Sequence, residues 1–154
     1  MKALVAAVAL GVALGAVPAL ADPTDEEPAA FRIDPDYAAG KKSIEARDWM
    51  AAITSLSSAA LRDTRNADIQ NYLGFAYRNA GKMDLAFSHY EKSLKLNPRH
   101  RGAHEYVGEA YLMVGNLRKA EEHLAALRMI CLIPCEELED LQKKIDSYRS
   151  RPVK

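Results

Sequence analysis

The chain has 154 residues, enough for one domain, and 49% of them are hydrophobic. Its 21 Lys and Arg side chains balance 21 Asp and Glu side chains, which gives a formal net charge of zero. Such a chain has no long-range electrostatic field that would gather nucleic acid or anionic lipid. The basic residues form no extended stripe either, so we expect no nucleic-acid partner.

The first 21 residues have the pattern of a secretory signal peptide. Lys2 supplies a positive start, residues 3–17 are apolar, and Ala19 and Ala21 form a small-x-small exit. A membrane anchor is the alternative, because the stretch is nearly long enough to span a bilayer, but its glycines and alanines lower its hydrophobicity. We expect cleavage after Ala21, export of the mature chain and no insertion of that chain into the membrane.

Helical patterns follow a short leader. Residues 22–32 are acidic and contain prolines, which predicts a flexible segment. Asp34-Pro35 then supplies the cap and first-turn residues of a helix. The pattern predicts helices over about 35–46, from 49 onward, over 67–80, 83–96, 101–114 and 117–130, and a final amphipathic helix over 135–149 before the tail 150–154.

A fixed register runs through these helices. The residues that recur every 34 positions are Gly40, Gly74, Gly108 and, in the following helices, Ala52, Ala86, Ala120. A period of this length is the sequence sign of a solenoid, whose units bury their apolar faces by stacking. The units cover 33–66, 67–100 and 101–134, and we expect the helix at 135–149 to cap the last one. We also expect the first helix of a unit to press on the second at Gly74 and Gly108.

Further residues hold fixed places in each unit. The second copy reads Leu73-Gly74-x-x-Tyr77, then Gly81, Ala86, Tyr90 and Pro98, and the third reads Val107-Gly108-x-x-Tyr111, then Gly115, Ala120 and Leu124. The first copy departs from this pattern, with Ser43 at the tyrosine position and Arg47 at the turn glycine. These residues resemble the tetratricopeptide repeat. The resemblance implies an all-α fold, a right-handed superhelical solenoid of three helical hairpins plus the capping helix.

The resemblance also implies a location and a binding face. A signal-like start followed by three repeats is similar to small exported bacterial tetratricopeptide proteins, which implies the periplasm. In this family the first helix of each hairpin lines a concave groove that binds other proteins. The residues expected in this groove are Tyr37, Lys41, Asn71, Phe75, Arg78, Glu105, Glu109 and Met113.

That set of side chains mixes aromatic, amide and charged groups. Such a mixture suits an extended peptide or a partner helix better than a small polar metabolite. Some members of the family hold a C-terminal carboxylate with asparagine and lysine side chains. Tyr72 and Phe75 stand at the asparagine positions here, so we do not expect that mode.

Cys131 and Cys135 are the only cysteines. In an exported protein such a pair predicts a disulfide, which would pin the end of the third repeat to the capping helix. A redox pair is an alternative, because Cys135 begins a helix and a helix N-terminus favours the thiolate. The spacing, however, is not Cys-x-x-Cys.

A metal site is the other alternative. His100 and His104 are four residues apart on one helical face, which is a ligand spacing. A returning second helix would bring Cys131 and Cys135 towards them, so a site with two cysteine and two histidine ligands is a second hypothesis. The first hypothesis needs no metal and no cofactor.

The chain has no catalytic signature. It lacks an ordered Ser, His and Asp set, a nucleophile elbow and a glycine-rich phosphate loop, so we expect no enzyme. The sequence therefore favours a non-catalytic periplasmic scaffold that binds a protein or peptide through its concave groove. A metal- or thiol-handling protein is the alternative. The identity of the partner and the oligomeric state have no signature in the sequence.

Overall fold

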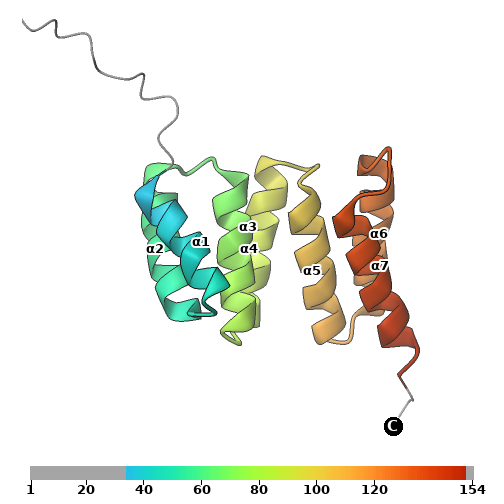
Figure 1. Ribbon diagram of the computed structural model, residues 1–154. Helices are drawn as coiled ribbons and strands as arrows, with labels where there is room; N and C mark the ends of the chain where they lie inside the picture. Colours follow the sequence, from blue (N-terminus) through green and yellow to red (C-terminus); the bar gives the residue numbers. More distant parts are fainter. Residues whose placement is uncertain (1–33, 152–154) are drawn as a thin grey trace, which may run out of the picture. The chain divides into compact units, whose positions relative to one another are not determined.

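Seven α-helices and no strand make up residues 34–151, which are the residues that the computed structural model describes (Figure 1). Their bounds are α1 Pro35–Glu45, α2 Trp49–Arg62, α3 Ala67–Asn79, α4 Met83–Leu96, α5 Arg101–Met113, α6 Leu117–Ile130 and α7 Glu136–Arg149. The predicted signal peptide, the leader and residues 152–154 lie outside the described part of the chain. Among the described helices, none has the length and apolar character needed to cross a membrane.

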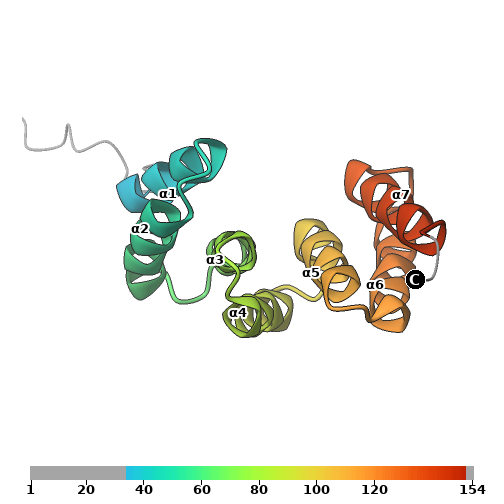
Figure 2. The ribbon, with the colours of Figure 1, turned by 90° about the horizontal axis from the view of Figure 1, so that it is seen from below.

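The helices of the repeats form two layers (Figure 2). Consecutive helices pair as the hairpins α1–α2, α3–α4 and α5–α6, and α7 packs on both α5 and α6. Helix α1 also contacts α3, α3 contacts α5, and α5 contacts α7. The odd-numbered helices therefore form one continuous inner layer, and α2, α4 and α6 form the outer layer.

Close approach at glycines holds the layers together. A methyl group on Gly40 would lie 2.5 Å from the Leu56 side chain, and one on Gly74 would lie 2.6 Å from the Tyr90 ring. These two contacts join the first and second helices of a hairpin, as expected for Gly74. At Gly108 the nearest side chain is instead Leu141 of α7, 2.7 Å from the added carbon. The expected contact of Gly108 is therefore made across to the capping helix, which packs over α5.

The turn inside each hairpin has the same backbone geometry. Gly81 and Gly115 have φ values of +75° and +78°, and Arg47 has the same left-handed conformation at +57°. In each turn the amide of the following residue donates to the carbonyl five positions back, as Lys82 N does to Tyr77 O at 2.9 Å. This is the hydrogen bond of a Schellman helix end. The degenerate first repeat thus keeps the turn without its glycine.

Helix α7 closes the end of the array. Its Leu141 and Ile145 are fully buried and join a cluster with Ala120, Leu124 and Leu127 of α6. A solenoid exposes an apolar face at its last repeat, and α7 covers that face.

Gly74→Leu tests the glycine contact. Because the new side chain has no room against Tyr90, we expect the free energy of unfolding to fall by about 3 kcal/mol and the melting temperature to fall by about 10 °C or more. Circular dichroism on heating measures this change. Lys92→Leu, on the exposed surface of α4, is the control; similar melting of both variants would reject the register.

Lys82→Asn tests the start of α4. At the equivalent positions Asp48 accepts a hydrogen bond from Ala51 N and Asn116 accepts one from Lys119 N, whereas Lys82 makes no side-chain cap. Supplying the missing acceptor should raise the free energy of unfolding by about 1 kcal/mol in urea titrations. Lys92→Asn, in the helix interior, should instead lower it slightly, since asparagine is a poor helix former.

Candidate binding groove

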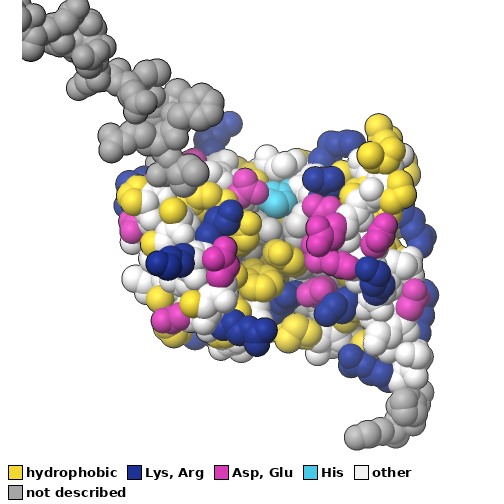
Figure 3. Space-filling view, viewed as in Figure 1, with side chains coloured by type: hydrophobic (Ala, Val, Ile, Leu, Met, Phe, Trp, Pro, Cys, Tyr) yellow, Lys and Arg dark blue, Asp and Glu magenta, His cyan; other side chains and the backbone are white. Residues whose placement is uncertain are grey.

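A groove runs along α5, with α3 and α7 as its walls. It contains two hollows, one of about 410 Å³ towards the start of α5 and one of about 240 Å³ towards its end. We call the first the acidic hollow; its lining includes Asp68, Asn71, Glu105, Glu136, Glu137 and Asp140. We call the second the mixed hollow; its lining includes Arg78, Glu109, Met113, Lys144 and Tyr148. Figure 3 shows acidic side chains gathered over α5 and α7 beside a hydrophobic patch.

Negative charge in the acidic hollow is only partly compensated. His100 Nε2 lies 3.0 Å from Asp68 Oδ1, and Arg101 Nε lies 3.4 Å from Glu137 Oε1. Glu105 and Glu136 have no ion pair within residues 34–151. The hollow therefore holds more carboxylates than cations.

Burial and the excess of carboxylates both change the pKa of Glu105. Partial burial raises the pKa of its carboxyl group to about 7, and the nearby Glu109, Asp140 and Glu137 raise it further than Arg78 lowers it. Both causes disfavour the charged form. A carboxyl group of this kind gains from any ligand that brings positive charge.

Asn71 lies in the same hollow and is almost completely buried, with 4% of its surface exposed. Its Oδ1 has no hydrogen-bond partner within the described residues. A buried acceptor without a partner costs free energy, so such atoms are rare in folded proteins.

An ion-pair network lines the mixed hollow. Arg78 Nη1 lies 2.9 Å from Glu109 Oε2 and donates to Tyr106 O at 3.0 Å, while Lys144 Nζ lies 3.8 Å from Glu109 Oε1. Arg78 is only 7% exposed. Its guanidinium therefore fastens α3 to α5 and is less available to a partner than the sequence suggests.

Aromatic rings continue the groove towards the first repeat. Phe75 lies between Trp49 and Tyr106, with ring centroids 6.0 and 4.8 Å away. Beside them the rings of Tyr37 and Tyr72 are 6.0 Å apart, and Lys41 Nζ lies 5.6 Å from the centroid of Tyr72. Together with Trp49 at the start of α2, the rings of the inner layer form a partly exposed apolar strip.

The eight residues predicted for the groove occupy different parts of the inner layer. Asn71 and Glu105 line the acidic hollow; Arg78, Glu109 and Met113 line the mixed hollow. Tyr37, Lys41 and Phe75 belong to the aromatic strip. The whole wall supplied by α7 was missed, since that helix was treated only as a cap. The start of α7 lies 35 residues after the start of α5, close to the 34-residue period, and this spacing is the signal for that wall.

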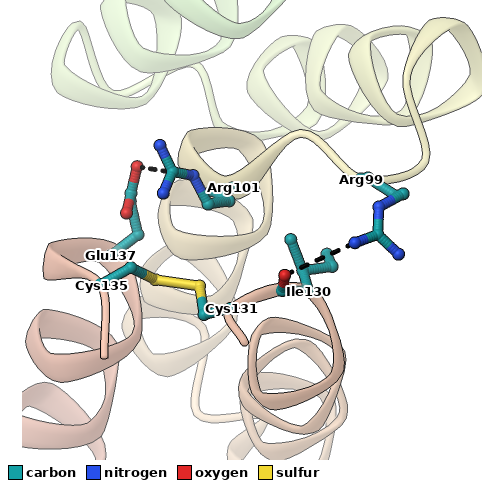
Figure 4. The surroundings of a disulfide bond; sticks show 6 residues. All are labelled: Arg99, Arg101, Ile130, Cys131, Cys135 and Glu137. Atoms are coloured by element: carbon teal, nitrogen blue, oxygen red, sulfur yellow. Dashed lines mark hydrogen bonds and ion pairs between the residues drawn. A yellow bond between two sulfur atoms is a disulfide. The ribbon is translucent and has the colours of Figure 1, made fainter. Parts of the chain in front are cut away.

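The two cysteines join the end of α6 to the start of α7. The structure places the sulfur atoms of Cys131 and Cys135 within bonding distance of each other, as the predicted disulfide requires (Figure 4). On either side of it, Arg101 pairs with Glu137 and Arg99 Nη2 donates to Ile130 O at 3.5 Å. These contacts tie the start of the α7 wall to the start of α5.

The histidines of the metal hypothesis make other contacts. His100 Nδ1 accepts from Ala103 N, while its Nε2 faces Asp68. His104 Nε2 lies 3.0 Å from Pro98 O, and its Nδ1 lies 2.9 Å from His123 Nδ1. Within residues 34–151 no group of three or more His, Cys, Asp or Glu side chains is arranged to hold a metal ion. The structure does not assemble the proposed four-ligand site.

The fold and the groove define an α-helical repeat protein. Residues 67–100 match the tetratricopeptide repeat family. The fold resembles that of the Yersinia enterocolitica type III secretion translocator chaperone SycD, with a TM-score of 0.66 and 18% identity over 74% of this chain and 81% of that chain. It also resembles the second tetratricopeptide domain of human RPAP3, in complex with the HSP70 peptide SGPTIEEVD, with a TM-score of 0.65 and 15% identity over 75% and 93% of the two chains.

One sequence relative is the uncharacterized protein ycf37 of Pyropia yezoensis. It is 38% identical over 55 residues, which cover 36% of this chain and 31% of that protein. The match thus spans about a third of the relative's length. Residues 67–100 are therefore a tetratricopeptide repeat by sequence, and the other described helices have the fold of such repeats.

Glu105→Gln tests the electrostatics of the acidic hollow. Since the pKa of Glu105 is about 7 in the folded protein and near 4.5 in the unfolded chain, the unfolded chain loses its proton first as the pH rises. Glu105 therefore makes the free energy of unfolding fall between about pH 4.5 and 7. The glutamine variant should lack this component and be more stable at pH 8 by about 1 kcal/mol, allowing for solvent screening.

The measurement is urea unfolding of both proteins at pH 5 and pH 8. Glu139→Gln, on an exposed part of α7, makes the same chemical change outside the groove and serves as the control. An equal pH response of the Glu105 and Glu139 variants would contradict the prediction.

Proposed function

We propose that the protein is an exported, non-catalytic adaptor that holds a peptide segment of a partner protein in the groove between α3, α5 and α7. The signal-like sequence of residues 1–21 supports export, and the similarity to small exported bacterial repeat proteins supports the periplasm. In this proposal the disulfide at Cys131 and Cys135 is a structural link and binds no metal.

One observation carries the proposal: a single face presents two hollows and an adjoining aromatic strip. The two hollows share α5 as their floor and together follow its length. An extended or helical peptide laid along α5 would contact both hollows, and its apolar side chains would meet Phe75 and Tyr106. Exposed aromatic residues on a rigid scaffold are typical of protein-binding surfaces.

Proteins of the same fold support a peptide ligand. The human RPAP3 domain holds an HSP70 peptide, and SycD is a chaperone of a secretion translocator. By analogy of fold we place the ligand of this chain on the inner layer. The ligand itself must differ, because the human peptide ends in acidic residues and one half of the groove here is acidic.

Photo-crosslinking in the exporting cell tests this function. Benzoylphenylalanine replaces Met113, which is 63% exposed and lines the mixed hollow, and in a matched control it replaces Met50, which is 57% exposed on α2. We expect a discrete light-dependent adduct from position 113 alone, because only that side chain faces the groove. Mass spectrometry of the adduct then identifies the partner.

Two results would reject the groove as the working surface. The first is the same adduct from both methionine positions, which would indicate unspecific contact. The second is an adduct only from position 50, which would move the binding surface to the outer layer.

A further inference from the structure

Five carboxylates surround one end of the groove, on three different helices. Asp68 comes from α3, Glu105 from α5, and Glu136, Glu137 and Asp140 from the first turns of α7. Neighbouring carboxylates repel one another, and partial burial strengthens that repulsion. His100 pairs with Asp68, Arg101 with Glu137 and Lys143 with Asp140, which leaves Glu105 and Glu136 without an ion pair within residues 34–151.

The side-chain amide of Asn71 is a second observation at this hollow, separate from the charge of the carboxylates. Asn71 lines the hollow, and its buried Oδ1 accepts no hydrogen bond within residues 34–151. A ligand that fits the hollow must therefore donate a hydrogen bond as well as carry positive charge. Ammonium and guanidinium groups are donors without acceptors, so they satisfy both requirements.

We propose that the acidic hollow is a specificity pocket for a lysine or arginine side chain of the bound peptide, with Asn71 and Glu105 as its direct ligands. This inference rests on the proposed function, because the cationic side chain belongs to a peptide that continues along α5. The hollow holds about 410 Å³, which accommodates the end of such a side chain. Glu136 and Asp140 of α7 supply further acceptors around the same space.

The surface next to the acidic hollow indicates that the cation belongs to a peptide and not to a small free amine. The Arg78–Glu109–Lys144 network lines the mixed hollow, where Met113 and Tyr148 are available for apolar contact. A small free amine would leave this part of the groove empty. A peptide with one cationic and one apolar side chain would fill both hollows. Its cation would lie among the carboxylates of the acidic hollow, and its apolar side chain would lie in the mixed hollow.

Selection from a random nonapeptide library displayed on phage tests the pocket, with the purified protein as bait. We expect the selected peptides to share one arginine or lysine. The best arginine peptide is then synthesised with citrulline, which keeps the planar shape but replaces one terminal amino group by a carbonyl oxygen, and so removes the charge and two of the five N–H donors. Fluorescence polarisation should show a loss of affinity of about tenfold or more with citrulline, as for a hydrogen-bonded charged group.

Variants assign the effect to the pocket. Glu105→Gln and Asp140→Asn should each weaken the arginine peptide by about tenfold while changing the citrulline peptide little, the pattern of direct coupling. Glu139→Gln lowers the charge of α7 equally but lies outside the pocket, so it should leave both affinities unchanged. Met113→Ala combined with Tyr148→Ala should weaken both peptides.

Three outcomes would overturn the inference. Selected peptides that need Met113 and Tyr148 but carry no cation would leave the groove function intact and remove the cation pocket. Free argininamide that binds as tightly as the peptide would make the hollow a small-molecule site. Selection of no peptide, or binding that ignores every groove variant, would remove both the pocket and the proposed function.

Discussion

The whole array depends on helices that approach one another without an intervening side chain. Gly40 and Gly74 let the first helix of a hairpin rest directly on a large side chain of the second, and Gly108 does the same for Leu141 of α7. Because each such contact involves only neighbouring helices, the stability of the array is built step by step along the chain. The alignment of α3, α5 and α7, and hence the groove, is a result of these contacts.

Helix α7 shows how one element serves two purposes. Its Leu141 and Ile145 bury the apolar end of the last repeat, while Glu137 and Lys144 face the groove. Binding and stability are consequently coupled in this helix. The predicted disulfide between Cys131 and Cys135 would hold the start of the same helix and so position the wall of the acidic hollow.

The sequence predicted the fold well because packing positions repeat. The helix ends lie within about a residue of the expected ones, since caps and turns such as Asp34 and Gly81 mark them locally. The groove was predicted less completely. Nothing in the periodicity shows that Arg78 is buried against Glu109, because that pairing depends on distances between helices. The role of α7 as a wall was missed because its glycine position holds Gln142, which hides the register.

The 34-residue register also separates the positions that pack the helices together from the positions that determine the chemistry of the groove. The glycine position of the packing seam keeps one residue type through the three repeats, as Gly40, Gly74 and Gly108 show, whereas the inner face carries Tyr37, Asn71 and Glu105 at one repeated position. Substitutions at inner-face positions change the chemistry of the groove without touching the seam. A scaffold of this design can acquire a new partner through a few substitutions on its inner face while its packing contacts stay unchanged.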